Sequence, residues 1–130
     1  GAPISVGDET LADAVVCTGF GPSEASLRPM VRGISAVGAK ARTVRMLGSA
    51  AIMLAWVACG RLSAYFEADL NAWDMAAGVL LVREAGGVVT GLDGARWEVA
   101  TRTLIASNAP AHAELQATLA DAKVTGLDDV

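Results

Sequence analysis

Hydrophobic and polar residues follow one another in blocks that favour strands and helices in turn. The apolar run at 11–20 has a β-branched centre and stops at Gly-Phe-Gly-Pro, which is typical of a buried strand that ends in a loop. Apolar residues at helical spacing follow it, with Ser26 as the expected N-cap and Pro29 inside the first turn. This part of the sequence therefore predicts a strand and then a helix.

The alternation continues to the end of the chain. Shorter apolar or alternating runs predict four more strands, at 41–47, 62–70, 87–92 and 103–108. Longer apolar runs predict helices at 49–59 and 73–84, and Asn108 is expected to cap a last helix. Strands that alternate with helices of this length predict a layered α/β/α domain with a mostly buried, mixed sheet.

Composition and charge narrow the class of protein. The chain has 130 residues, of which 53% are apolar and 18% charged, and this balance fits one domain with a packed core. Its net charge is −4, and the ten Lys and Arg residues are scattered singly, so nucleic acid is not an expected partner. The longest apolar run, between Arg45 and Arg61, is shorter than the roughly 20 residues of a membrane span. A signal peptide pattern is absent from the start.

The two cysteines and the single histidine are reactive residue types, but their positions in the sequence indicate structural roles. Cys17 and Cys59 lie in apolar strings without metal-site or redox spacing, which predicts reduced core thiols and a cytoplasmic protein. His112 stands alone in the last predicted helix, so we expect it at the surface or in a helix cap.

Asp74 stands at the mouth of the apolar helix predicted at 73–84. A carboxylate in the first turn of a helix is stabilised by the free N–H groups and the helix dipole, by about 0.3 to 1 kcal/mol, and this needs no function. The same position holds a carboxylate still at a strand–loop–helix junction, where open α/β sheets tend to bind ligands. Magnesium sites use one or two such carboxylates. A helix cap and a metal ligand are therefore both open.

Two further candidates lie near other strand ends. Glu67, near the end of the strand predicted at 62–70, is either a solvated surface residue or part of a site. Gly48, Ser49 and Ala50 begin a helix directly after a strand, and their backbone N–H groups form a position for an anion or a hydroxyl. The sequence contains no Ser/His/Asp set, Walker loop or spaced His/Cys set.

Taken together, these segments resemble the C-terminal signature of the inositol monophosphatase family, which are lithium-sensitive, magnesium-dependent phosphomonoesterases. Arg45 and residues 48–51 fit the family's Arg, Gly, Ser/Thr, Ala-Ala run, and 58–60 fit its Ala-x-Gly before a strand. Residues 73–78 fit Trp-Asp-x-Ala-Ala-Gly, and 84–87, Glu-Ala-Gly-Gly, complete the pattern. The fold implied is the C-terminal half of a sugar-phosphatase-like fold.

The resemblance implies a role for each candidate. Asp74 matches the aspartate that binds a catalytic Mg²⁺ ion, and Glu67 matches the acid that contacts a hydroxyl of the substrate's polyol. Gly48, Ser49 and Ala50 match the segment that lines the sugar or inositol side of the pocket. The implied activity is magnesium-dependent hydrolysis of inositol monophosphate, or of a similar polyol or sugar phosphate, by an enzyme that is a homodimer when complete.

The family's other metal ligands are missing from this sequence. They lie in a Glu-Glu pair and an Asp-Pro-x-Asp-Gly-Thr/Ser motif, and neither occurs in the 130 residues, whereas such enzymes are normally about twice as long. We therefore expect residues 1–130 to be a C-terminal domain, with 1–10 as the junction to an N-terminal half and 125–130 as a frayed tail. The N-terminal half, in the same or a second chain, is expected to be needed for activity.

Two alternatives stay open. Phosphatases for histidinol phosphate, adenosine bisphosphate or fructose bisphosphate fit the same signature. A non-catalytic binding or regulatory module derived from the fold and kept for its interface is the second alternative. Because one carboxylate alone holds magnesium weakly, we also expect the 130-residue chain by itself to be close to inactive.

Overall fold

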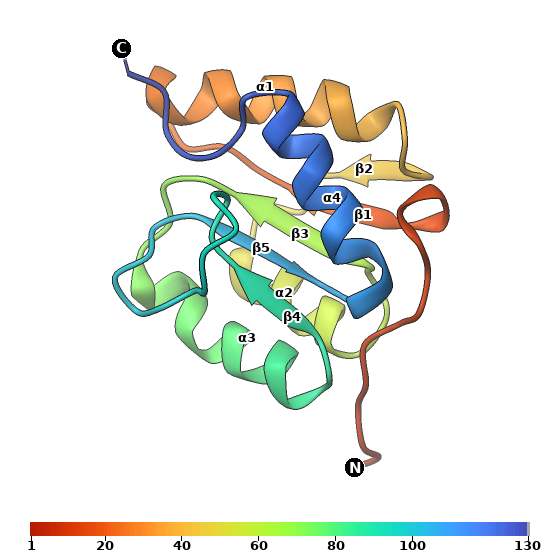
Figure 1. Cartoon of the computed structure of the whole chain (residues 1–130). Coiled ribbons are helices and arrows are strands. Elements are labelled where there is room, and N and C mark those ends of the chain that lie inside the picture. Colours follow the sequence, from red (N-terminus) through yellow and green to blue (C-terminus); the bar gives the residue numbers. More distant parts are fainter. Residues whose placement is uncertain (130) are drawn as a thin grey trace.

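The computed structural model describes residues 1–129 and shows a five-stranded sheet with helices on both faces (Figure 1). The strands are β1 (Val15–Thr18), β2 (Thr43–Arg45), β3 (Ala64–Glu67), β4 (Val88–Thr90) and β5 (Leu104–Ser107). Their order across the sheet is β2-β1-β3-β5-β4. β1 runs parallel to β2 and β3, whereas β5 runs antiparallel to β3 and β4. The predicted mixed sheet is confirmed.

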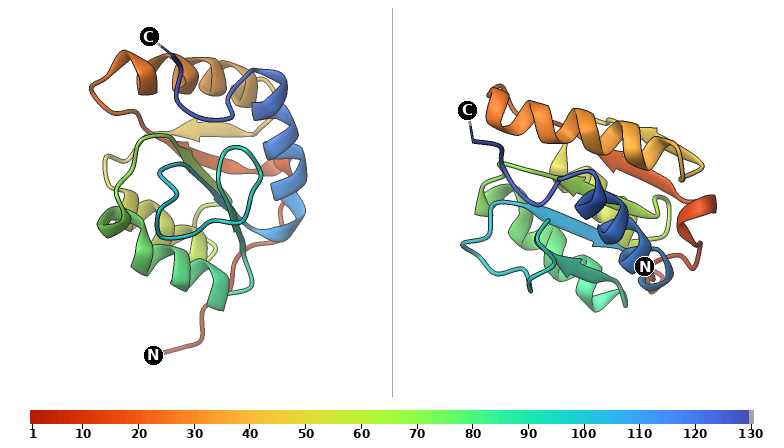
Figure 2. Two further views of the ribbon diagram at one scale, coloured as in Figure 1. Left: turned by 60° about the vertical axis from the view of Figure 1, so that its left-hand side comes forward. Right: turned by 45° about the horizontal axis from the view of Figure 1, so that its top comes forward.

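Four helices form the outer layers. They are α1 (Glu24–Gly38), α2 (Ala50–Ala58), α3 (Ala72–Glu84) and α4 (Ala109–Asp121). α1 and α4 pack together on one face of the sheet, and α2 and α3 pack together on the other (Figure 2). The layered α/β/α prediction is therefore confirmed.

Each face of the sheet has its own core, because successive side chains of a strand point to opposite faces. Phe66 of β3 packs in the core under α1 and α4, whereas its neighbour Tyr65 packs in the core under α2 and α3. Both side chains are fully buried. Burial on both faces explains why the strands read as almost unbroken apolar runs.

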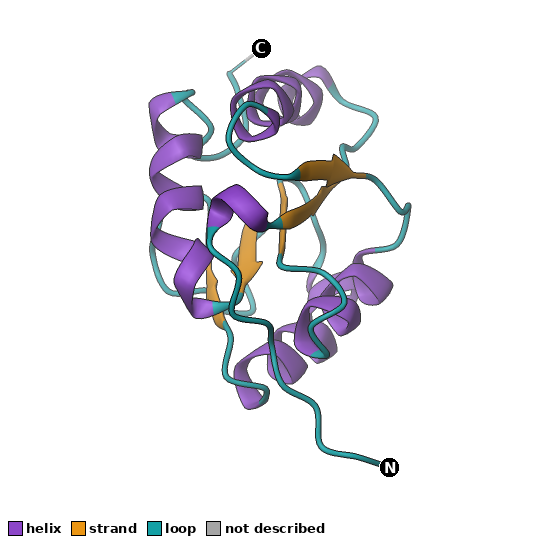
Figure 3. Ribbon diagram, turned by 90° about the vertical axis from the view of Figure 1, so that its right-hand side faces the viewer, coloured by secondary structure: helices purple, strands orange, loops and turns teal. Residues whose placement is uncertain are grey.

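The start of the first predicted strand is wrong. Leu11–Asp13 forms a short 3-10 helix that packs against α4 (Figure 3). Leu11 is fully buried in the core under α1 and α4, so this apolar residue anchors the 3-10 helix to the core and does not belong to a strand. The strand itself begins only at Val15.

The predicted start of α1 is also wrong, by a few residues. Ser23 is the N-cap, and its side chain accepts the N–H of Ser26 at 3.3 Å. Pro29 therefore lies beyond the first turn, where its missing N–H leaves the carbonyl of Ala25 without its usual partner. The N–H of Asp128 donates to that carbonyl at 2.9 Å. A contact from the far end of the chain thus compensates for the proline.

The segment expected to fray, 125–130, is attached to α1 at Asp128. The guanidinium of Arg32 donates to both carboxylate oxygens of Asp128 at 2.7 Å, and to the carbonyls of Ala122 and Lys123 at 3.1 and 2.9 Å. Val130 lies outside the described residues.

The two cysteines and the histidine only partly follow the predictions. Both thiols are free, but only Cys17 lies in a core, and Cys59 is half-buried at the end of α2. Burial raises the pKa of Cys17 to about 11, so this thiol is chemically inert at neutral pH. His112 is buried instead of exposed, and its ring contacts the hydroxyls of Ser107 and Thr90 at 2.8 and 3.1 Å. None of the helices within residues 1–129 combines the length and apolar character of a membrane span.

Candidate active site

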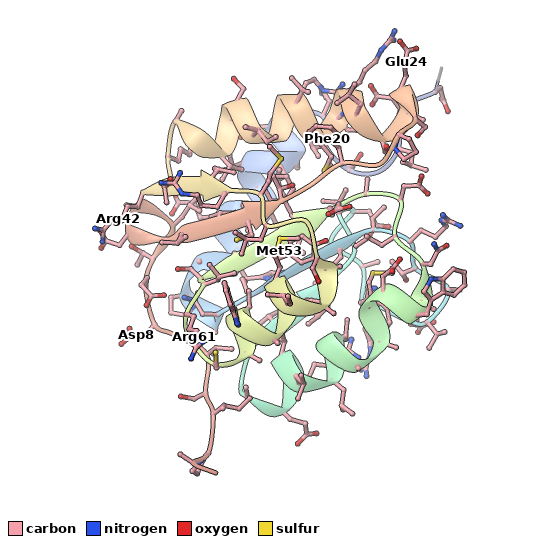
Figure 4. The ribbon with its side chains drawn as sticks, turned by 180° about the vertical axis from the view of Figure 1, so that it is seen from behind. Asp8, Phe20, Glu24, Arg42, Met53 and Arg61 are labelled. Carbon is pink, nitrogen blue, oxygen red and sulfur yellow. The ribbon has the colours of Figure 1, made fainter. Side chains whose placement is uncertain are left out.

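A cavity of about 380 Å³ brings together all five candidate site residues. Its wall consists of Gly19, Phe20, Met46, Gly48, Ser49, Ala50, Met53, Glu67, Leu70 and Asp74. Figure 4 labels Phe20 and Met53, which approach it from the loop after β1 and from α2. The wall is built where β1, β2 and β3 end, and these strands are parallel. Ligands of open α/β sheets bind at such carboxyl ends.

The turn between β2 and α2 forms one side of the cavity. Gly48 has a φ of +77°, a left-handed conformation that glycine adopts at no steric cost. Ser49 is the N-cap of α2, and its hydroxyl accepts the N–H of Ile52 at 3.3 Å. The N-terminal end of α2, where backbone N–H groups lack helical acceptors, therefore lies at the cavity wall beside Ala50.

Asp74 completes a capping box at the start of α3, whose N-cap is Asn71, and it lines the cavity as well. Its Oδ2 accepts the backbone N–H of Asn71 at 3.0 Å, and this bond fixes the carboxylate at the start of the helix. The side chain is half-buried and belongs to the wall. The helix-cap interpretation is confirmed, and the cap leaves Oδ1 available for a further ligand.

Glu67 is a half-buried wall residue, so the solvated-surface alternative is wrong. The hydroxyl of Tyr65 donates to its Oε1 at 2.6 Å. Burial raises the pKa of Glu67, the negative charges of Asp74 and Asp69 raise it further, and the Tyr65 hydrogen bond opposes them. Burial and the charge of Glu67 also raise the pKa of Tyr65, which therefore keeps its proton.

The loop between Glu67 and Asp74 is held from outside the cavity. Asp69 has a φ of +60°, which is uncommon for a residue other than glycine. Arg102 contacts this loop twice, through its guanidinium to Asp69 Oδ1 at 2.6 Å and through its carbonyl, which accepts the N–H of Leu70 at 2.8 Å. The loop that spaces the two candidate carboxylates is thus anchored to the segment before β5.

The cavity wall includes two carboxylates, those of Asp74 and Glu67. Within residues 1–129, no three His, Cys, Asp or Glu side chains come together in a way that holds a metal ion. Asp74, with one oxygen engaged by the helix, fits a single coordination position. Magnesium is usually bound by one or two carboxylates, with water and substrate phosphate completing a near-octahedral array, so Asp74 fits one ligand of such a site.

Several wall residues were not predicted from the sequence. Phe20, Met46, Met53 and Leu70 carry no chemical signal, and only the fold places them together. Gly19 of the wall and Tyr65, which contacts the wall residue Glu67, have weak sequence signals. Gly19 lies near the end of the apolar run 11–20, which is predicted to be a buried strand. Tyr65 precedes Glu67 by two residues, which puts the side chains of Tyr65 and Glu67 on one face of a strand.

Comparison with known proteins gives one consistent result. The family model described as "Inositol monophosphatase family" matches residues 1–125. An inositol-1-monophosphatase of Synechocystis is 51% identical over 77 residues, which are 59% of this chain and 27% of that protein. A protein of Xylella fastidiosa named Nus factor SuhB is 52% identical over 79 residues, covering 60% and 29% of the two chains.

A solved structure agrees at the level of the fold. The inositol monophosphatase from Anabaena superposes with a TM-score of 0.82 and 34% identity, covering 92% of this chain and 49% of the other. The chain thus spans only about a quarter to a half of the length of the proteins it matches.

Proposed function

The chain belongs to the inositol monophosphatase family, and we propose that it forms the substrate-side wall of a phosphomonoesterase and supplies one of its metal ligands. The substrate is inositol monophosphate or a similar polyol or sugar phosphate. One observation carries this proposal: Asp74, Glu67 and the turn 48–50 line one cavity at the ends of three parallel strands.

In this proposal the carboxylate of Asp74 would hold a metal ion at the cavity wall. The capping bond from Asn71 keeps the carboxylate in one place, and Oδ1 is the oxygen left to bind. When bound, a magnesium ion supplies positive charge to the phosphoryl oxygens and lowers the pKa of an attacking water. Asp74 itself moves no proton; its task is to position.

The alcohol part of the substrate lies against Glu67 and the start of α2. An ionised Glu67 accepts a hydrogen bond from a hydroxyl, and the free N–H groups at the start of α2 donate to an oxygen of the substrate. Positioning of this kind is a large part of catalysis when the enzyme forms no covalent bond with its substrate.

In this proposal the remaining metal ligands come from outside residues 1–129, in an N-terminal half or a second chain. Support comes from the absence of a three-residue metal cluster in the described part of the chain, and from the greater length of the relatives. The complete enzyme is proposed to be a magnesium-dependent, lithium-sensitive homodimer, as the family resemblance implies, and its two free cysteines support a cytoplasmic setting.

Replacement of Asp74 by asparagine tests this function. In protein completed with the other half of the fold, Asp74→Asn is expected to lower phosphatase activity on inositol monophosphate at least 100-fold, because a neutral amide binds magnesium poorly. Asp13→Asn is the matched control, since Asp13 is exposed and lies outside the cavity wall. Activity near that of the unmodified protein in Asp74→Asn would restrict Asp74 to its helix-cap role.

A non-catalytic binding module is the second candidate. It is favoured by a relative whose name, Nus factor SuhB, does not denote a phosphatase. Completed protein that hydrolyses none of the esters of inositol, histidinol, adenosine bisphosphate and fructose bisphosphate would favour this candidate.

A further inference from the structure

Tyr65 holds the carboxylate of Glu67 from within the core. The chain contains a single tyrosine, Tyr65, whose side chain is fully buried. Its hydroxyl donates to Glu67 Oε1 at 2.6 Å, a short distance that is typical of a hydroxyl bound to a carboxylate. The two residues are two positions apart on β3, so the strand itself brings their side chains to one face.

Gly19 leaves the space in which that carboxylate lies. A Cβ at position 19 would lie 3.3 Å from Cδ of Glu67 and only 2.6 Å from its Oε1, and the second distance is shorter than real Cβ atoms show, so the carboxylate would have to shift. The φ of Gly19 is not positive, so its backbone is open to other residues and the demand is for space alone. Oε1 is thus enclosed by the Tyr65 hydroxyl and the bare backbone after β1.

We propose that Tyr65 is a positioning residue, which fixes Oε1 of Glu67 against Gly19 so that Oε2 accepts a hydroxyl of the substrate. This inference rests on the proposed function, in which Glu67 faces the polyol. Within residues 1–129 the protein donates hydrogen bonds to Oε1 and not to Oε2, and the cavity wall includes Glu67. A free rotamer of Glu67 would cost entropy when substrate binds, and the Tyr65 contact removes that cost.

The hydrogen bond from Tyr65 also affects the ionisation of Glu67, because negative charges surround this carboxylate. Asp69 and Asp74 face Glu67 from the following loop and from α3, and both disfavour its ionised form, as burial does. Arg102 is paired with Asp69 on the outer side of the loop. The Tyr65 hydroxyl opposes these effects, because it donates to the ionised carboxylate. Tyr65 therefore helps to keep Glu67 an acceptor at neutral pH.

The single tyrosine makes the contact observable in the 130-residue chain. Tyrosine labelled with ¹³C at Cζ gives one NMR resonance, and we expect that resonance to move with pH as Glu67 titrates. In Glu67→Gln this movement disappears. Gly19→Ala is expected to displace the carboxylate and to shift the resonance at pH 7, whereas Gly38→Ala, where a Cβ meets nothing within 4 Å, leaves it in place.

The reciprocal measurement is made on Glu67. With ¹³C-labelled glutamate, Tyr65→Phe is expected to increase the proton affinity of Glu67 about tenfold, because a hydrogen bond to the ionised form is lost. The assignment comes from the resonance that Glu67→Gln removes. An unchanged proton affinity in Tyr65→Phe, or a Tyr65 resonance that ignores the titration of Glu67, overturns the positioning role.

These measurements need neither metal nor substrate, so they separate the two proposals. Loss of the coupling overturns the role of Tyr65 whatever the activity of the completed enzyme. An intact coupling in a completed protein without phosphatase activity supports the contact and overturns the proposed function instead.

Discussion

Asp74 meets two demands at one position. The bond between its Oδ2 and the N–H of Asn71 stabilises the start of α3, and the same bond keeps the carboxylate still at the cavity wall. A cap and a ligand need the same property, which is a fixed carboxylate at a helix N-terminus. The alternatives raised by the sequence are therefore compatible.

The burial of Glu67 predicts how the stability of the fold depends on pH. Burial raises its folded-state pKa above the ordinary value of about 4.3, so the folded state binds this proton more tightly than the unfolded chain. The stabilisation from protonated Glu67 is complete below the pKa of the unfolded chain and is lost as the pH rises through the higher pKa of the folded state. The free energy of unfolding should therefore fall with pH in this window, relative to Glu67→Gln.

Urea unfolding between pH 4 and 8 measures this difference. Glu114→Gln, which changes an exposed carboxylate of α4, serves as the control and should follow the unmodified chain. Equal pH dependence in Glu67→Gln and the unmodified chain would show that ionised Glu67 costs the fold nothing.

At the scale of elements, Gly78 explains part of the Trp-Asp-x-Ala-Ala-Gly pattern. A Cβ at this position of α3 would lie 2.5 Å from Cβ and 2.6 Å from Cδ1 of Leu54 in α2. The glycine thus lets the two helices that carry the cavity wall approach closely. The sequence pattern marks the position, but only the packing of α3 on α2 gives the reason.

Gly78→Ala is expected to lower the free energy of unfolding by about 1 to 3 kcal/mol, because the added methyl overpacks the α2–α3 contact despite better helix propensity. Gly38→Ala in α1 adds the same methyl where nothing lies within 4 Å, and it should be neutral or slightly stabilising. Chemical denaturation of both variants checks this. Equal stabilities would mean that α2 and α3 can separate at no cost.

The bounds of helices and strands were predictable where local sequence signals agreed. The predictions failed where contacts between distant residues decided the bounds. Helix α4 begins after Asn108 as expected, because the cap and the apolar spacing coincide. Two serines compete at the start of α1, and Ser23 prevails with help from Asp128, which satisfies the carbonyl that Pro29 leaves free. The contact between Tyr65, Glu67 and Gly19 likewise depends on the pairing of β1 with β3, which spacing within one segment cannot reveal.

At the scale of the whole molecule, α2 and α3 have apolar residues on exposed surface as well as in the core. The exposed ones are Ile52, Trp56, Trp73, Leu80 and Leu81. A helix that is apolar all round is usually buried on more than one side. This composition agrees with a position between the described sheet and the rest of a larger fold.

The isolated chain is therefore expected to associate through this face. Sedimentation velocity over a range of concentrations should show self-association, and the paired replacement Trp73→Lys and Leu80→Lys should reduce it. Val31→Lys, which changes an exposed apolar residue of α1, is the control. A strictly monomeric chain at all concentrations would argue that the α2–α3 face needs no cover.

Complementation tests the central claim, that this chain carries half of a bipartite phosphatase site. Activity on inositol monophosphate with magnesium is measured for the 130-residue chain, for the other half of the fold, and for their mixture. We predict turnover only in the mixture, and its loss when Asp74→Asn is used. Turnover by the 130-residue chain alone that disappears in Asp74→Asn would contradict the account.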